Sequence, residues 1–290
     1  MSLNKDSVLN TFIVATVLCL VCALVVSSAS VALKPIQSQN AQLDRKKNIL
    51  EVTGFSPEEI EAGGGTEAVF KDRFTAVIID LNTGKEALEA CETAMEVAKG
   101  KPIPDVLATY DQLWASKRKD TPLSIELEKK QDFGAIKNRE NFSHVYILKS
   151  IDGKIETYVF PVRGMGLWSL MQGYFAVEPD FQTVKGLTYY QQGETAGLGG
   201  EVQNPQWKKK WIEKQIFDDN GTVALKVSKG DQSGNEYGVD ALSGATITSN
   251  GVTNMIKFWM GDNGFGPYIE LNKSGSTTTP PASGDGGNDE

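Results

Sequence analysis

The feature that most constrains the fold of this chain is a long run of uncharged residues near its start. Residues 7–33 contain no charged side chain, and residues 12–26 within them are almost entirely apolar. A helix needs about 20 such residues to cross the hydrocarbon core of a bilayer. The charged region before the run is short, with only Lys5 beside Asp6. The long apolar run and the short charged region before it together favour an uncleaved membrane anchor over a removable signal peptide.

Changes in composition along the chain predict four parts. The sequence after the apolar run is polar and reaches three successive glycines at 63–65, which is typical of a linker. The C-terminal end is rich in Ser, Thr, Pro, Gly and Asp, a composition that predicts disorder. We therefore expect an N-terminal transmembrane anchor at 1–34, a linker at 35–66, a folded domain at 67–272 and a disordered tail at 273–290.

Charge and residue counts exclude several classes of function. The chain has 29 basic and 37 acidic residues, a net charge of −8, and no basic run longer than the one at 208–210. Nucleic-acid binding is therefore disfavoured. The single histidine, His144, argues against a self-contained zinc site or a histidine-based catalytic site. Cys19 and Cys22 lie inside the apolar run, where we interpret them as small apolar residues.

Hydrophobic periodicity predicts a domain of mixed secondary structure. Residues 152–153 are Asp-Gly, a hairpin signal between two apolar segments. A helix is expected to begin at Asn204-Pro205, with asparagine as its cap and proline at its first position. We expect further helices at 86–99 and through 252–259, and strands at 74–81, 145–148, 155–162, 173–177, 184–190 and 223–227. The predicted fold class is α+β, a mainly antiparallel twisted sheet flanked by helices, behind one N-terminal transmembrane helix.

Residues 240–251, Asp-Ala-Leu-Ser-Gly-Ala-Thr-Ile-Thr-Ser-Asn-Gly, combine a tight Gly-Ala turn with four hydroxyl side chains. An apolar pattern at helical spacing follows. The start of a helix offers unpaired backbone N–H groups and a positive dipole end, which together suit a phosphate. A threonine hydroxyl there could bind a phosphate or be esterified to one. Alternatively, Thr248 or Ser249 is only the N-cap of the last helix.

The segment Ser-Gly-Ala-Thr-Ile-Thr, with Asp240 three residues before its serine, resembles the flavinylation motif of the FMN-binding domain family. Further motifs recur in order at 164–169, 193–200, 204–207 and 264–267. Together with the apolar N-terminal run, they resemble the family of C subunits of sodium-translocating NADH:quinone oxidoreductases over nearly the whole chain.

That resemblance implies a covalent cofactor and assigns residues to it. The last threonine of the motif, Thr248, would carry FMN through a phosphoester bond that a flavin transferase installs after recognising Asp240. The resemblance assigns Lys229 less strongly, as a cation near the ring that would favour the reduced or anionic flavin. The phosphate would be seated by Ser243, Gly244, Ala245 and Thr246, and the rest of the flavin would contact Leu167, Trp168, Ser169, Glu194, Thr195 and Leu198.

The implied function is electron relay within a membrane complex. The chain would be one component of a sodium-transporting NADH:ubiquinone reductase, with no catalytic residue of its own and no turnover alone. It would pass single electrons from a membrane iron–sulfur centre to the next flavin, beside the A, B, D, E and F subunits. The family places this domain on the periplasmic side of the bacterial inner membrane. Lys34 and the basic residues at 45–47 predict the opposite orientation by the positive-inside rule.

Three other interpretations stay open. The first is the G subunit of the ferredoxin:NAD oxidoreductase complex, which shares the flavin motif. The second is a membrane-anchored assembly or binding protein without flavin, in which Thr248 is merely a helix cap. The third is an anchored hydrolase with Ser243 or Thr248 as nucleophile. It is disfavoured because His144 is distant in the sequence and no other base is marked.

Overall fold

The computed structural model describes residues 8–274, so residues 275–290 of the predicted tail lie outside the described part. The chain divides into two units at Lys46 and Lys47, and each is described separately. The first unit consists of most of helix α1 (Val8–Val52). Among the described residues, α1 alone is long and apolar enough to cross a membrane, with a mean hydropathy of 2.7 over its most apolar 18 residues.

The segment from residue 35 to residue 66 is mostly helical, which corrects the predicted linker. Helix α1 continues through Pro35 to Val52, and it is followed by α2 (Pro57–Ala62) and α3 (Thr66–Arg73). The last turn of α1 is buried against the sheet through Ile49, Leu50 and Val52. Apolar burial of this kind stabilises helix in a segment whose polar composition alone suggests a linker.

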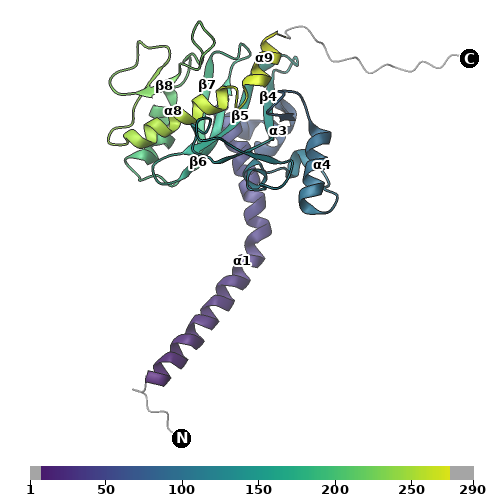
Figure 1. The fold of residues 1–290 in the computed structure, drawn as a ribbon, viewed down its shortest axis with the longest axis vertical. Coiled ribbons are helices and arrows are strands. Elements are labelled where there is room, and N and C mark those ends of the chain that lie inside the picture. Colours follow the sequence, from purple (N-terminus) through teal and green to yellow (C-terminus); the bar gives the residue numbers. More distant parts are fainter. Residues whose placement is uncertain (1–7, 275–290) are drawn as a thin grey trace, which may run out of the picture. The chain divides into compact units, whose positions relative to one another are not determined.

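The second unit is built on a five-stranded antiparallel sheet in the order β1-β4-β5-β6-β7 (Figure 1). Its strands are β1 (Phe74–Asp80), β4 (Phe142–Lys149), β5 (Ile155–Met165), β6 (Leu170–Val177) and β7 (Val184–Gln191). Each neighbouring pair is antiparallel. The predicted α+β class and its mainly antiparallel sheet are confirmed. The expected turn at Asp152-Gly153 joins β4 to β5, with Gly153 in the left-handed region at φ 79°.

Shorter elements complete the domain. The pair β2 (Ser124–Glu126) and β3 (Asn138–Glu140) is antiparallel, and the pair β8 (Lys226–Ser228) and β9 (Gly238–Asp240) is parallel. The helices are α4 (Leu88–Lys99), α5 (Val106–Thr109), α6 (Gln112–Ser116), η1 (Gly199–Gln203), α7 (Pro205–Lys209), α8 (Thr246–Met260) and α9 (Gly266–Ser274).

The prediction of a strand at 223–227 is wrong for most of these residues. Val223 forms only an isolated antiparallel bridge with Phe217, and the N–H groups of Ala224 and Leu225 both donate to the carbonyl of Ile216. The chain there is therefore irregular, and a continuous strand begins only at Lys226. The apolar residues of this segment had suggested a strand. In the structure Leu225 is buried, with 2% exposure, whereas Val223 and Ala224 are only partly buried.

Both faces of the sheet are covered. Successive side chains of a strand point to opposite faces, so neighbouring residues pack into different clusters. On β5, Phe160 packs into the cluster that contains Met255 and Trp259 of α8, whereas its neighbour Val159 packs into the cluster that contains Leu50 of α1. Helix α8 thus lies along one face, against β5. This packing fixes the first turn of α8 relative to the ends of β5 and β7.

A buried ion pair ties β3 to β5 under α8. Glu140 is fully buried, and its two carboxylate oxygens lie 2.6 and 2.5 Å from the guanidinium nitrogens of Arg163. The Arg163 guanidinium also lies over the Trp259 ring, 5.2 Å from its centroid, and the Trp259 indole N–H donates to the Arg163 carbonyl at 2.7 Å. One charged pair therefore connects the sheet with the helix that carries the predicted attachment residue.

We predict that Glu140→Ala lowers the free energy of unfolding by about 3–5 kcal/mol, because it leaves the buried Arg163 guanidinium without its counter-ion. The measurement is urea unfolding of the full chain in detergent, followed by tryptophan fluorescence. Glu156→Ala is the matched control, since Glu156 pairs with Arg73 at 3.0 Å with its side chain 44% exposed. It should cost less than about 1 kcal/mol. Equal losses in the two variants would contradict this account of the buried pair.

Candidate functional site

The site is centred on the carboxylate of Glu194, which lies in the loop after β7 and is 8% exposed. It accepts five hydrogen bonds. The backbone N–H of Leu167 donates to Oε2 at 3.0 Å, and those of Trp168 and Ser169 donate to Oε1 at 3.0 Å. The Ser169 hydroxyl also donates to Oε1 at 3.0 Å, and the Thr248 hydroxyl donates to Oε2 at 2.6 Å. One carboxylate therefore joins three of the segments that the sequence had singled out.

The turn between β5 and β6 supplies three of these donors. It closes with a hydrogen bond from the Gly166 N–H to the Ser169 carbonyl at 2.9 Å. Three successive N–H groups then face one anion, the arrangement known as a nest. A side chain at Gly166 is excluded, because its Cβ would lie 2.6 Å from the Glu194 carboxyl carbon. Glycine at 166 is thus required for the close approach of Glu194.

Thr248 lies in the first turn of α8 and is 1% exposed. The Gly199 backbone passes directly over its hydroxyl, since a Cβ at Gly199 would lie 2.5 Å from Thr248 Oγ1. At Gly244 a Cβ would meet the Leu198 side chain at 3.0 Å, so Leu198 covers the turn that precedes α8. Gly244 itself has φ 70°, a conformation that glycine adopts without strain. The segment after Glu194 therefore encloses the hydroxyl that the sequence had singled out.

The helix-cap interpretation of these hydroxyls is wrong. The N-cap of α8 is Ala245, which has no side chain able to cap. The Thr248 hydroxyl instead donates to Glu194, and the Ser249 hydroxyl accepts from the Leu242 N–H at 3.1 Å. The N–H groups of a first helical turn have no intrahelical acceptor. Here no side-chain cap competes for them, which leaves this end of α8 suited to an anion.

Apolar side chains surround this helix start and remain open to solvent. Trp168 is 70% exposed, Ile247 57%, and Leu167 and Leu198 43% each. Three of them were predicted from the family resemblance, and Ile247 was missed. Its signal was its position between two motif threonines at the start of a helix, where one side chain of the turn must face outward. Flat and branched apolar groups around a polar centre are what an aromatic ring system requires from its site.

The other predicted residues do not join the Glu194–Thr248 pair. Ser243, Thr246, Thr195 and Lys229 are exposed, and no hydrogen bond is described between their side chains and either residue of the pair. The Thr195 carbonyl accepts from the N–H groups of Leu198 and Gly200, at 3.1 and 2.9 Å. Thr195 thus shapes the glycine-rich segment through its backbone.

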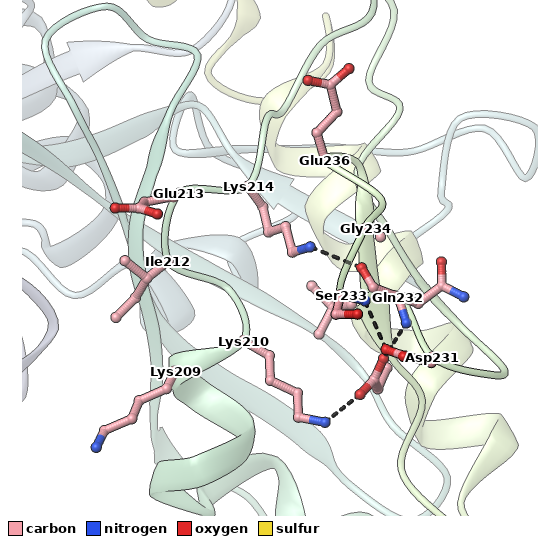
Figure 2. Close-up of a pocket in the computed structure, with 13 residues that line it drawn as sticks. Lys209, Lys210, Ile212, Glu213, Lys214, Asp231, Gln232, Ser233, Gly234 and Glu236 are labelled. Carbon is pink, nitrogen blue, oxygen red and sulfur yellow. Dashed lines mark hydrogen bonds and ion pairs between the residues drawn. The ribbon is translucent and has the colours of Figure 1, made fainter.

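Asp240 is partly buried and is one of the residues that line an open pocket of about 520 Å³ (Figure 2). Its Oδ2 forms an ion pair with Lys210, and its Oδ1 accepts from the Gln232 N–H at 2.7 Å. Both contacts lower the pKa of the Asp240 carboxyl, the Lys210 hydrogen bond more than the Gln232 one. Lys214 holds the same loop by donating to the Gln232 and Asn235 carbonyls at 3.1 and 2.6 Å. The lysines after α7 therefore fix the segment that leads into the motif, a role the sequence did not reveal.

The hydrogen bonds at Glu194 set its charge. Desolvation acts to raise the pKa of this carboxyl, but it is outweighed by the hydrogen bonds from the Thr248 hydroxyl, the Trp168 and Leu167 N–H groups and the Ser169 hydroxyl, so the pKa is lowered. The group is ionised at neutral pH. An ionised carboxylate that receives a hydrogen bond from a hydroxyl can orient that hydroxyl and can accept its proton. The arrangement thus provides an aligned hydroxyl beside a helix start and a rim of apolar side chains.

The fold and this arrangement define a flavin-binding class of domain. Residues 166–261, which span from the β5–β6 turn to the end of α8, match the FMN-binding domain family. The crystal structure of Shewanella oneidensis NqrC superposes with a TM-score of 0.67 at 33% identity, covering 79% of this chain and 96% of that one.

Relatives of nearly full length then give the family. The chain is 43% identical to the C subunit of Na(+)-translocating NADH-quinone reductase from Vibrio anguillarum, over 95% of its own length and 99% of the relative. It is 40% identical to the Yersinia pestis protein of the same name, over 94% and 96%. The chain belongs to the family of C subunits of Na(+)-translocating NADH-quinone reductases, which are oxidoreductase complexes. These relatives decide against the interpretation as a component of the ferredoxin:NAD oxidoreductase complex.

We predict that Glu194→Gln lowers the free energy of unfolding at neutral pH by about 1–3 kcal/mol, because charged hydrogen bonds are lost. A carboxyl whose pKa is lowered in the folded state stabilises above its unfolded pKa, and this contribution is lost as the pH falls through the folded pKa. Urea unfolding between about pH 6 and pH 3 should therefore show a steeper loss in the parent than in the variant. If the unfolding free energies of the parent and the variant fell equally with pH, the assignment of Glu194 as an ionised, hydrogen-bonded carboxylate would be contradicted.

Proposed function

We propose that this chain is an electron-relay protein that carries FMN covalently, as a phosphoester on Thr248. The observation that supports it best is the Thr248 hydroxyl. It is not used as a cap, it is oriented by a carboxylate, and it lies at an uncapped helix start below four exposed apolar side chains. Family membership supports the same proposal. A bound FMN supplies reversible one- and two-electron chemistry that no amino-acid side chain here provides.

Each part of the site has a proposed role toward the cofactor. The start of α8, with Ser243, Gly244, Ala245 and Thr246, would hold the phosphate through backbone N–H and hydroxyl groups. Leu167, Trp168 and Leu198, with Ile247 added, would exclude water from the ring. Ser169, Glu194 and Thr195 would supply polar contacts near it, and Lys229 would add positive charge. Asp240 would be recognised by the flavin transferase.

We further propose the place of this chain in the complex. Electrons would arrive singly from an iron–sulfur centre in the membrane and leave to the next flavin, towards ubiquinone, in a complex that exports sodium. The A, B, D, E and F subunits would be its partners, and a flavin transferase would act during maturation. The anchor 1–34 would hold the FMN-binding domain at the membrane. Covalent attachment favours this role because a tethered flavin cannot be lost to the surroundings between electron transfers.

The proposed orientation puts the FMN-binding domain on the periplasmic side, against the positive-inside rule applied to the residues after the span. We predict that Ile151→Cys, at the exposed hairpin tip where Ile151 is 92% exposed, reacts with a membrane-impermeant maleimide in intact cells with a permeabilised outer membrane. The background should be low, because Cys91 is buried and Cys19 and Cys22 lie in the apolar part of α1. Labelling that requires lysis of the inner membrane would place the domain in the cytoplasm.

We predict that the full chain, co-expressed with a flavin transferase, gives a fluorescent band on a denaturing gel and that Thr248→Ala abolishes the fluorescence. The band should survive denaturation because a phosphoester is covalent. Thr246→Ala is the matched variant. It removes the other threonine hydroxyl of the same turn but leaves the acceptor, so its band should stay fluorescent. A dark parent band, or a fluorescent Thr248→Ala band, would overturn the proposed attachment.

A further inference from the structure

The pair formed by Thr248 and Glu194 has the geometry of an activated nucleophile. A hydroxyl and a carboxylate base lie within hydrogen-bond reach, at 2.6 Å, and the base is itself oriented by other groups. From the sequence alone, no base was marked near Thr248, and this argued against Thr248 as a nucleophile. The base was hidden because the two residues are 54 positions apart in the chain.

The orientation of the base is over-determined. Its Oε1 receives the Ser169 hydroxyl as well as two backbone N–H groups, and the Ser169 oxygen in turn accepts from the Gly193 N–H at 2.8 Å. Oε2 faces Thr248 and receives one further N–H, from Leu167. The carboxylate therefore has one fixed position, with Oε2 directed at the hydroxyl. A structural anchor for the turn would need only the contacts to residues 167–169.

We propose that Glu194 is the general base for the attachment of flavin to its own chain, a role that rests on the flavin attachment proposed above. The transferase would supply the activated flavin, and this chain would supply both the nucleophile and its base. Glu194 is then a catalytic residue of its own modification, because it touches the reacting oxygen.

The step balances as a phosphoryl transfer. The Thr248 oxygen attacks the flavin-side phosphorus of a flavin phosphoanhydride, the class of donor that a flavin dinucleotide represents. The new bond joins Thr248 Oγ1 to phosphorus, and the phosphoanhydride bond breaks, with its electron pair leaving on the released nucleoside monophosphate. The hydroxyl proton passes to Glu194 and then to solvent. No oxidant or reductant is needed.

Access to the hydroxyl requires the covering segment to move, since Thr248 is 1% exposed. The backbone over it is Gly199, within a run that also holds Gly197 and Gly200. Gly197 has φ 75°, and a Cβ there would meet no atom within 4 Å. The transferase can displace a segment of this composition while the four hydrogen bonds from residues 167–169 still hold the Glu194 carboxylate.

The test is the rate at which the purified full chain in detergent gains flavin mass with transferase and flavin adenine dinucleotide. Glu194→Gln should slow attachment about 10²-fold, as expected for loss of a general base. Glu201→Gln is the matched control, because Glu201 lies seven residues further along the chain, in η1, and contacts Asn204 instead of Thr248. It should react at the parent rate. Circular dichroism shows whether each variant is folded.

A second variant separates base chemistry from structure. Glu194→Ala should attach flavin slowly. Added formate should raise its attachment rate several-fold, because the small carboxylate enters the vacated nest. Chloride at equal ionic strength should give no gain. A folded Glu194→Gln variant that reacts at the parent rate, or an Ala variant that formate leaves unchanged, would overturn the proposal. A parent chain that gains no flavin at all would instead overturn the proposed function itself.

Discussion

The hydrogen bonds on the Glu194 carboxylate are the interaction on which the rest of the site depends. A buried carboxylate is stable only when its lone pairs are filled, and here they are filled by the β5–β6 turn and by α8. The same contacts give the turn its conformation and Thr248 its hydroxyl direction. Gly166 and Gly199 are needed because the carboxylate and the hydroxyl leave no space for a Cβ. One ionised group thus makes a single site out of three distant segments.

The scaffold explains why this site can be both rigid and open. Helix α8 is fixed to the sheet through Met255 and Trp259 and, below them, through the Glu140–Arg163 pair. Because packing on the sheet stabilises α8, the helix does not need a side-chain cap, and the Thr248 hydroxyl in its first turn is left for another role. Trp168 and its apolar neighbours remain exposed because they belong to turns at the edge of this packing. Such a surface suits a flavin that must be held firmly and still exchange electrons with partners.

Much of the fold could be predicted from the sequence, because the sheet follows local rules. The apolar segments on either side of the Asp152-Gly153 turn predicted the central hairpin, and the apolar run predicted α1. The linker prediction failed because Pro35 and polar composition hid a helix that is stabilised by burial of Ile49 and Leu50. The site residues came from the family resemblance, yet neither the Glu194–Thr248 contact nor the Asp240–Lys210 pair could be read from spacing. Both are tertiary contacts between loops.

The most direct test of the account is tandem mass spectrometry of the protein purified from native membranes. Trypsin should release residues 230–257 as one peptide, which holds all four hydroxyl side chains of the motif. The account predicts the added mass of an FMN phosphoester on this peptide, with fragment ions that assign it to Thr248. An unmodified peptide, or flavin assigned to Ser243, Thr246 or Ser249, would contradict it.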